Sequence, residues 1–230
     1  MATYVISDLH GEYERLDQLL TEIEFSEKDD LYIIGDVVDR GQEGIRILRE
    51  VMQHSNMHML LGNHELMMIR YFADDVTEKE KRRWNRNRNF YTLAGLDQLP
   101  EDEREKLFTF LNGLPDHAAF TVNGKKYVLV HGYWADNTFD RVWNRPTLET
   151  PPAFGTDVTM IIGHTPVCEY VCPGNDEDQY VYSRKLTEAG DHFRILHTAS
   201  FIDIDCCVGY GMSAARLACL RLDDGKEFYV

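Results

Sequence analysis

The chain has 230 residues, which is long enough to bury a sizeable hydrophobic core, and no Pro-, Gly- or Ser-rich linker divides it. Hydrophobic residues make up 43%, but no apolar run approaches the roughly 18 residues of a membrane span. The formal net charge of −15 opposes non-specific binding to nucleic acid, which depends on basic side chains. We therefore expect one domain, residues 1–230, in a monomer without membrane or nucleic-acid partners.

The N-terminal residues MATYVISDLHG contain no basic region, and Asp8 soon interrupts their apolar stretch. A secretory signal would need both features, so we expect a cytoplasmic protein. The five cysteines are an odd number, and all lie in the last third of the chain. We expect reduced, buried thiols rather than a disulfide framework or a zinc site.

Apolar runs rich in β-branched residues recur along the chain and predict strands. They occupy residues 3–7, 31–35, 57–62, 126–132 and 159–164. Helical patterns follow the first three runs, at 12–24, 42–54 and 64–74. Alternating strands and helices predict an α/β layered sheet, in which ligands bind outside the carboxyl ends of the strands.

Residues 75–115 are polar and rich in helix formers, and they predict a helical insertion near this ligand-binding edge. Within them, KEKRRWNRNR at 79–88 carries six basic residues against one acid. We interpret this segment as a solvated helix face, with the binding of extra substrate phosphates as the alternative. Trp84, Phe90 and Tyr91 could stack on a nucleobase, although a place in the core fits them equally well.

The remainder of the chain is expected to complete the sheets. Residues 168–192 are expected to form a loop region. The segments 193–209 and 214–230 predict closing strands, and Asp224 with Gly225 predicts a tight hairpin.

Side chains able to bind metal follow each predicted strand. The motifs are SDLHG, GDVVDRG, GNHE, VHG and GHTP, which contain Asp8, His10, Asp36, Asp39, Arg40, Asn63, His64, Glu65, His131 and His164. Mixed imidazole and carboxylate ligands suit Mn, Fe or Zn, and two such ions about 3.5–4 Å apart can clamp an in-line displacement at phosphorus. Each motif alone also fits a helix cap, a turn or a core histidine, but their joint occurrence favours a metal site.

Together these motifs resemble those of the calcineurin-like metallophosphoesterases, and within them the phosphoprotein phosphatase family in its compact bacterial and phage form. The resemblance implies a layered αββα sandwich, in which two central mixed β-sheets are flanked by helices. It also implies two divalent metal ions, of which manganese is expected and iron or zinc are alternatives. A hydroxide that bridges the two ions would attack phosphorus in line.

The resemblance also implies roles for individual residues. One metal ion would be held by Asp8, His10 and Asp36, and the other by Asp36 as the bridge with Asn63, His131 and His164. His64 would be the general acid, oriented by Asp39. The substrate phosphate would be bound by Arg40, Asn63 and Arg145, the last within VWNRP. Glu65 would at most support the site from behind the metal ligands.

Three positions depart from the family pattern. Ser7 replaces the usual glycine before the first ligand, and Tyr133 replaces the second glycine of the usual His-Gly-Gly. The glycine that usually precedes the cysteine of the last motif is also missing from FIDIDCCVGYG. We expect Tyr133, the insertion at 75–115 and the region 168–192 to line the rim of the site and to set specificity.

The predicted activity is that of a metal-dependent phosphomonoesterase, a serine/threonine or dual-specificity protein phosphatase acting on phosphorylated proteins, peptides or small phosphate esters. The main alternative is a symmetrical hydrolase of dinucleoside polyphosphates (diadenosine tetraphosphate), because the bacterial enzymes of that kind share these motifs. The alternative from another class is a non-catalytic module that binds metal or phosphopeptide. The presence of all the predicted ligands together with His64, Asp39 and Arg40 favours an enzyme.

Overall fold

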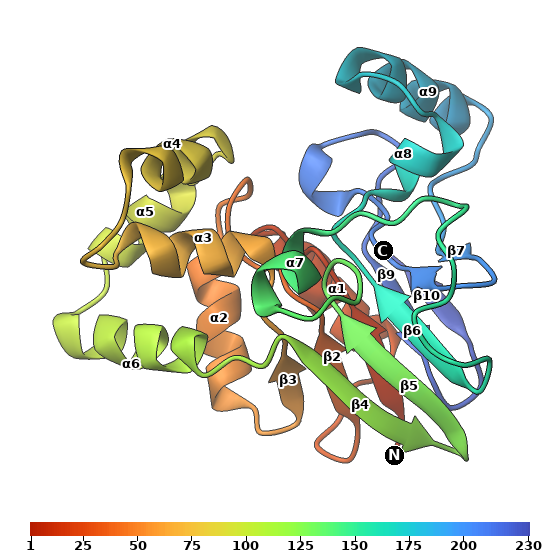
Figure 1. Ribbon diagram of the computed structural model, residues 1–230, viewed down its shortest axis with the longest axis horizontal. Coiled ribbons are helices and arrows are strands. Elements are labelled where there is room, and N and C mark those ends of the chain that lie inside the picture. Colours follow the sequence, from red (N-terminus) through yellow and green to blue (C-terminus); the bar gives the residue numbers. More distant parts are fainter.

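The computed structural model describes residues 1–230 and contains two five-stranded mixed β-sheets that are flanked by helices (Figure 1). This arrangement confirms the predicted fold class. No helix combines the length and the apolar character that crossing a membrane would require.

The first sheet has the order β10-β9-β1-β2-β3. Its strands are β1 (Thr3–Ile6), β2 (Asp30–Ile33), β3 (Met57–Met59), β9 (Ala218–Arg221) and β10 (Glu227–Tyr229). The first three strands run parallel, whereas β9 pairs antiparallel with β1 and with β10. The predicted hairpin at Asp224 and Gly225 joins β9 to β10, with Gly225 at a φ of +76°.

The second sheet has the order β4-β5-β6-β8-β7. Its strands are β4 (His117–Val122), β5 (Lys125–Val130), β6 (Val158–Ile162), β7 (Leu196–His197) and β8 (Ile202–Asp203). The strands β5, β6 and β8 run parallel, so their carboxyl ends meet at one edge. The closing strands predicted over 193–209 are much shorter than expected, because the chain after β8 turns into a one-turn 3₁₀ helix at Val208–Tyr210.

The helices predicted after the first three strands are present, within about three residues of the expected ends. The helices are α1 (Tyr13–Glu22), α2 (Gly44–Gln53), α3 (Asn63–Tyr71), α4 (Glu78–Arg86), α5 (Phe90–Asp97), α6 (Glu101–Asn112), α7 (Thr138–Trp143), α8 (Val167–Val171) and α9 (Asp176–Glu188). Figure 1 shows α4, α5 and α6 beside α2 and α3, away from the second sheet.

The expectation of a loop over residues 168–192 is wrong, because α8 and α9 occupy most of it. A local signal for α9 was present in the sequence. The Asn175 side chain accepts a hydrogen bond of 3.0 Å from the Asp178 backbone amide, and three acidic residues fill the first turn. An Asn cap followed by acids favours a helix N-terminus because both satisfy its exposed amide dipoles.

Side-chain alternation along β1 divides the core into two layers. Tyr4 and Ile6 pack with the helices α1 and α2 on one face of the first sheet, whereas Val5 packs between the two sheets with Leu129 and Ile161. Successive strand residues point to opposite faces, so a strand buried on both faces is apolar throughout. This two-sided burial fixes the end of β1, where the first predicted ligands begin.

Candidate metal centre

The predicted ligands converge at the carboxyl ends of parallel strands from both sheets. They follow β1, β2 and β3 in the first sheet and β5 and β6 in the second. The side chains of Asp8, His10, Asp36, Asn63, His64, His131 and His164 are all at most 5% exposed. Such a concentration of buried polar groups requires mutual hydrogen bonds or a bound cation.

The backbone at this edge is strained. Six predicted site residues have a left-handed φ, between +44° and +71°: Asp8, His10, Asp36, Asp39, Arg40 and His164. A residue other than glycine in this region costs about 1–3 kcal/mol, and such residues persist only where the surrounding contacts enforce them. The strain turns each side chain out of the strand direction, so that residues close in sequence can face one point.

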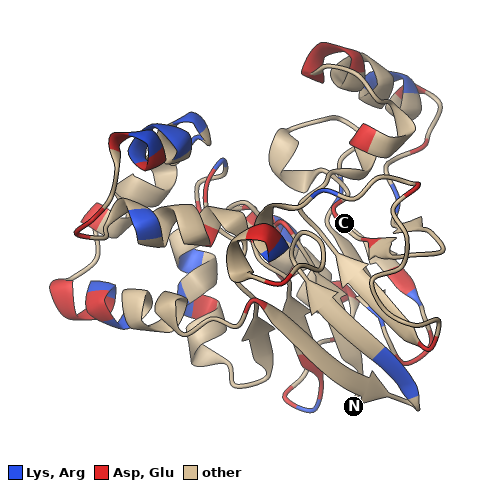
Figure 2. Cartoon of the chain, in the orientation of Figure 1, with Lys and Arg blue, Asp and Glu red and all other residues tan.

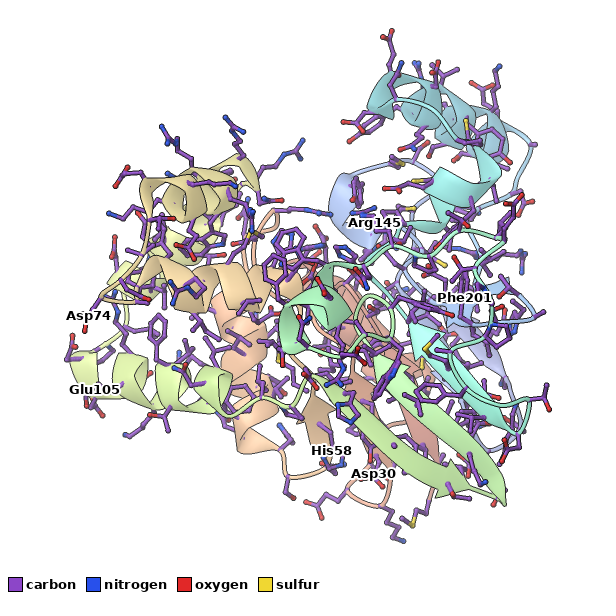
Figure 3. All side chains as sticks on the ribbon, viewed as in Figure 1. Asp30, His58, Asp74, Glu105, Arg145 and Phe201 are labelled. Atoms are coloured by element: carbon purple, nitrogen blue, oxygen red, sulfur yellow. The ribbon has the colours of Figure 1, made fainter.

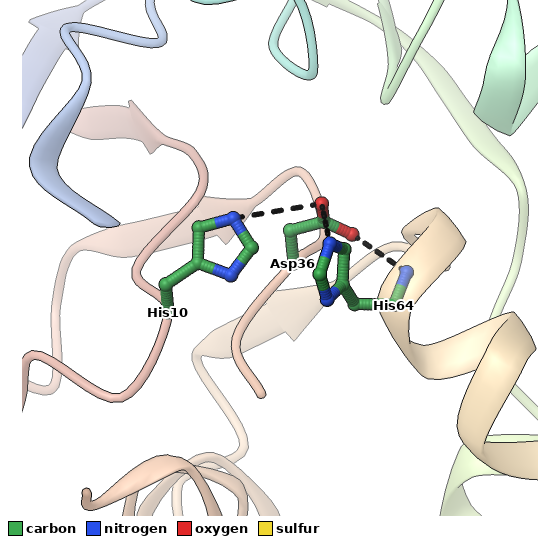
Figure 4. A group of neighbouring side chains, drawn as sticks. All are labelled: His10, Asp36 and His64. Atoms are coloured by element: carbon green, nitrogen blue, oxygen red, sulfur yellow. Dashed lines mark hydrogen bonds and ion pairs between the residues drawn. The ribbon is translucent and has the colours of Figure 1, made fainter. Parts of the chain in front are cut away.

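Asp36 lies at the middle of the cluster. Its Oδ2 is 3.8 Å from His10 Nε2 and 3.7 Å from His64 Nε2 (Figure 4). Its Oδ1 is 3.2 Å from His131 Nε2. The His64 backbone amide also donates to Asp36 Oδ1, at 3.0 Å. A carboxylate surrounded by imidazoles from both sheets is placed as a bridging ligand must be.

Backbone carbonyls orient three of the histidines. His10 Nδ1 donates to the Val38 carbonyl at 3.0 Å, and His131 Nδ1 donates to the Ile34 carbonyl at 2.7 Å. His164 instead has Nε2 near the Trp143 carbonyl, at 3.3 Å. Fixing one ring nitrogen leaves the other, as an acceptor, free for a metal ion.

Two groups of these side chains have donor atoms close enough to hold an ion. One group is His10, Asp36 and His64, and the other is Asp36, His131 and His164, with the donor atoms of each within 4.8 Å of one another. Asn63 belongs beside the second group, since its Oδ1 is 3.0 Å from His131 Nε2. Imidazole and carboxylate donors in this arrangement fit two borderline divalent ions that share Asp36.

Asp8 lies at the edge of this arrangement. Its Oδ2 accepts from the His164 backbone amide at 3.0 Å and from the Ser7 hydroxyl. The geometry therefore groups His64, rather than Asp8, with His10 and Asp36. The division of ligands between the two ions, and the roles of the individual residues, remain predictions.

Burial and neighbouring charges set the protonation of the cluster. Burial would raise the pKa of Asp36, but the charges of His131 and His64 outweigh it and hold that pKa well below its usual value. Burial, with Arg40 next, lowers the pKa of His10 well below its usual value. Burial, followed by the charge of His131, does the same to His164. Uncharged imidazole is the form that binds metal, so these two histidines are prepared as ligands.

Glu65 has a larger structural part than the sequence indicated. Its carboxylate accepts from the backbone amides of Asp36 (2.8 Å), Val37 (2.8 Å), Val38 (3.2 Å) and Gly62 (3.1 Å). It thereby holds the strained turn after β2 against the start of α3. The contact with Gly62 is a local helix-capping contact, but no local pattern identifies the other three, because Asp36, Val37 and Val38 lie 27 to 29 residues from Glu65 in sequence.

His64 is held by a chain of hydrogen bonds that reaches into the helical segment. Its Nδ1 donates to Asp39 Oδ2 at 2.6 Å, which leaves Nε2 directed toward Asp36. The Trp84 indole donates to the same Asp39 oxygen at 2.7 Å, and the Thr92 hydroxyl donates to the other oxygen at 2.7 Å. Trp84 is fully buried, so the expectation that it could stack on a nucleobase is wrong.

The two predicted phosphate-binding arginines both lie near Tyr210, but they differ in their partners. The Arg40 guanidinium lies over the Tyr210 ring, 4.3 Å from its centroid, and its buried Nη1 has no hydrogen-bond acceptor. Arg145, labelled in Figure 3, is 41% exposed and pairs with Glu169 of α8 at 2.5 Å. An unpaired guanidinium nitrogen beside a metal centre is suited to bind a phosphate oxygen.

The three departures from the family pattern have structural consequences. Ser7 donates to Asp8, a contact that glycine cannot make. The expectation that Tyr133 lines the rim is wrong: it is 9% exposed, and its hydroxyl donates to the Pro151 carbonyl at 2.7 Å. Asp205 occupies the place of the missing glycine. Burial, followed by the charge of Asp8, raises the pKa of Asp205 well above its usual value.

Comparison with known proteins identifies the family. The model of the calcineurin-like phosphoesterase family matches residues 1–178, which include every predicted metal ligand. The chain belongs to this family. This phosphoesterase is therefore a metal-dependent hydrolase of phosphoric esters, and its His and Asp clusters supply donors for the family's dinuclear metal centre.

Two curated relatives of this phosphoesterase carry the same name. A symmetrical bis(5'-nucleosyl)-tetraphosphatase from Erwinia tasmaniensis is 33% identical over 117 residues, which cover 50% of this chain and 39% of the relative. The protein of the same name from Proteus mirabilis is 40% identical over 87 residues, which cover 37% of this chain and 32% of the relative. The matches thus span between about a third and two fifths of these relatives.

Solved structures share the fold along nearly the whole chain. A metallophosphoesterase from Sphaerobacter thermophilus has a TM-score of 0.57 at 18% identity, covering 100% of this chain and 88% of the other. A protein serine/threonine phosphatase from Saccharomyces cerevisiae has a TM-score of 0.56 at 14% identity, covering 98% and 73%. These likenesses establish the fold and leave the substrate open.

Proposed function

We propose that this phosphoesterase hydrolyses dinucleoside polyphosphates, with diadenosine tetraphosphate as the model substrate. The observation that carries the proposal is the name shared by the curated relatives, bis(5'-nucleosyl)-tetraphosphatase, at 33% and 40% identity. It favours the alternative substrate predicted from the sequence over a phosphoprotein.

The metal centre would be built on Asp36 as the bridge, with His10, His131, His164, Asn63 and Asp8 around it. Two divalent ions bound there supply Lewis acidity and lower the pKa of water toward neutrality. A histidine that binds one of these ions does so through an uncharged nitrogen, so the positive charge of the ions would remain available to an anionic substrate.

The arginines bind the reacting phosphoryl group. Arg40 offers its unpaired Nη1, and Arg145 offers a guanidinium whose present acceptor, Glu169, lies on the exposed rim. The planar guanidinium groups match the oxygens of a phosphoryl group and would hold it in line with the attacking water. Asn63, at the start of α3, would bind a further phosphoryl oxygen.

His64 donates the proton that the leaving oxygen takes up. Asp39, fixed by Trp84 and Thr92, holds His64 Nδ1 as a donor, so the proton to be transferred is carried on Nε2, which faces the site. A nucleoside diphosphate leaves more readily than the alkoxide of serine, because its oxygen is much less basic. The need for His64 is therefore smaller for a polyphosphate than for a phosphoserine peptide.

The basic face of α4 suits a long polyphosphate chain. Figure 2 shows the basic residues gathered on α4, and Lys79, Arg82, Arg83 and Arg86 line one surface hollow there. A substrate with four linked phosphates carries more charge than the metal centre alone neutralises. Basic side chains beside the site would attract the remaining negative charge of the phosphates, although the protein as a whole is acidic.

The decisive experiment compares kcat/KM, with manganese added, on diadenosine tetraphosphate, a phosphoserine peptide and a phosphotyrosine peptide. Asp36→Asn serves as the blank. A preference of about a hundredfold for the dinucleotide, near 2.7 kcal/mol, supports the proposal. The reverse preference would make this phosphoesterase a protein phosphatase. No turnover of any substrate would favour the binding-module alternative.

A further inference from the structure

A cavity of about 320 Å³ opens between α3, α4 and α7. Its lining residues are Leu66, Met67, Arg70, Glu80, Arg83, Thr138, Phe139 and Trp143. The walls are largely apolar and aromatic, with a few charged groups at the α4 side. A concave, mostly apolar space of this size with a few polar groups is typical of a site for a small molecule.

This cavity shares two walls with the metal centre. Leu66 and Met67 lie two and three residues after His64 in α3, so the same helix carries the predicted general acid and part of the cavity lining. The Trp143 ring packs edge-on against the His164 ring, with centroids 6.0 Å apart. A molecule in the cavity would therefore lie next to a phosphoryl group held at the metal centre.

Two aromatic rings of α7 provide a stacking surface. Phe139 is 50% exposed, although burying a phenylalanine ring is normally favourable. Its ring lies 6.0 Å from that of Trp143, and their planes differ by 32°. Exposed aromatic rings beside an apolar cavity offer a surface on which a flat base can stack.

One arginine at the α4 side of the cavity is free of ion pairs. The Arg70 guanidinium pairs with Asp75 at 2.9 Å and with Glu80 at 3.0 Å, so its donors are already engaged. Arg83 makes no ion pair, and its guanidinium lies 5.3 Å from the Trp143 ring centroid and 6.0 Å from that of Phe139. The cavity thus combines stacking rings with one arginine whose guanidinium has no ion-pair partner and can bind a phosphate of a nucleotide.

We propose that this cavity binds one nucleoside of the substrate, with its base stacked on Phe139 and Trp143 and its phosphates directed past Arg83 toward the metal centre. The proposal rests on the proposed function for the identity of the substrate. In this proposal, α7 and α4 determine the specificity for a nucleoside. Arg83 is then the residue of the basic segment 79–88 that contacts the substrate.

The test compares Phe139→Ala with Phe90→Ala, a matched control that is 54% exposed and lies outside the cavity lining. Two quantities are measured. The first is kcat/KM on diadenosine tetraphosphate and on p-nitrophenyl phosphate, which has no nucleoside. The second is the dissociation constant of adenosine diphosphate, obtained by calorimetry.

Base stacking contributes enough for Phe139→Ala to lower kcat/KM on the dinucleotide about tenfold more than on p-nitrophenyl phosphate. Adenosine diphosphate binding should weaken about tenfold as well, while Phe90→Ala changes neither quantity by more than about twofold.

The outcomes separate this proposal from the proposed function. If the wild type does not cleave diadenosine tetraphosphate, yet Phe139→Ala still weakens adenosine diphosphate binding, the function fails and the nucleoside site stands. If the wild type cleaves it but Phe139→Ala lowers both substrates equally, or neither, the nucleoside site is overturned. An equal loss in Phe90→Ala would also overturn it.

A second variant guards against local distortion of α7. Arg83→Gln should raise the KM for diadenosine tetraphosphate about fivefold or more, because an attraction between unlike charges near a protein surface is lost. It should leave far-ultraviolet circular dichroism as in the wild type. A KM that equals the wild-type value would contradict the part assigned to Arg83.

Discussion

The loops that carry the predicted metal ligands differ from the surface formed by α4 and α7 in burial and in backbone conformation. In the loops, the ligands are buried, six site residues adopt left-handed backbone, and backbone groups fix the histidines. On the α4 and α7 surface, Phe139 is half exposed, and Lys79, Arg82 and Arg86 are exposed to solvent. Many contacts therefore fix the geometry of the metal centre, whereas the surface of α4 and α7 can be substituted with little effect on the rest of the fold.

The two regions are nevertheless connected through the helical segment. Trp84 of α4 and Thr92 of α5 both donate to Asp39, which in turn holds His64. The segment that carries the exposed basic face therefore also positions the predicted general acid.

Asp36→Asn is expected to abolish phosphate-ester hydrolysis and to weaken metal binding. It removes the carboxylate charge shared by both ligand groups while it keeps the shape of the side chain. We expect kcat/KM on p-nitrophenyl phosphate to fall by at least about ten-thousandfold, roughly 5.5 kcal/mol. Bound metal, measured by plasma mass spectrometry, should fall with it. A variant that keeps two ions per chain would contradict the bridging role.

His64→Asn separates a general acid from a metal ligand. As an acid, His64 contributes about a hundredfold to a thousandfold to kcat, and the loss should be greater for a phosphoserine peptide than for p-nitrophenyl phosphate. Metal content should stay at the wild-type value. If bound metal falls in parallel with activity, His64 is a ligand, as its grouping with His10 and Asp36 permits.

Trp84→Phe tests the connection between the two regions. The ring stays in the core, but the hydrogen bond to Asp39 is lost. Hydrogen bonds to charged groups contribute about 1.5–3 kcal/mol, so we expect a comparable loss in the free energy of unfolding and about a tenfold loss in kcat. Thr92→Val, which removes the donor to the other oxygen, should act in the same direction. Wild-type kcat in both variants would show that the segment does not position His64.

Arg82→Ala and Arg86→Ala remove charge from the hollow on α4 without touching the loops. We expect the KM for diadenosine tetraphosphate to rise about twofold to threefold at low salt, and the difference to vanish at about 1 M salt, where the screening length is near 3 Å. If neither substitution changes the KM, the segment 79–88 has no part in substrate binding. The interpretation of this segment as a solvated helix face would then hold.

The smallest effect concerns the cysteines. Four of the five are buried, and Cys172 alone is partly exposed. Burial raises the pKa of Cys206 and Cys207 well above the usual value, so their thiols stay protonated at pH 8. Because the reactive form is the thiolate, Ellman's reagent should modify one thiol per native chain and five after denaturation. Fewer than five after denaturation would reveal a disulfide.

Most of the metal centre could be predicted because its donors are encoded locally. A ligand one to three residues beyond a buried strand must lie at the carboxyl edge of the sheet, and the strands were recognisable from their apolar runs. Asp8 after β1, Asp36 after β2 and His164 after β6 are all of this kind. The prediction was possible because each ligand lies only a few residues from the strand that positions it.

Other features had weaker or no local signals. The helix α9 was missed although Asn175 caps it, because its polar sequence lacks a clear apolar stripe. Tyr133 was expected at the rim, but packing against Phe201 keeps it inside. Whether an aromatic residue faces substrate or core depends on neighbours that are distant in sequence.

By itself, then, the sequence determined the chemical type of this protein: the alternation of strands and helices, the edge at which ligands gather, and the set of nitrogen and oxygen donors. Only the tertiary structure decided which contacts hold that set in place. Glu65 clamps a turn that begins 29 residues earlier, Trp84 reaches Asp39 across 45 residues, and the cavity beside Trp143 needs three helices. Such contacts arise from packing between separate elements, and no local pattern of residues encodes them.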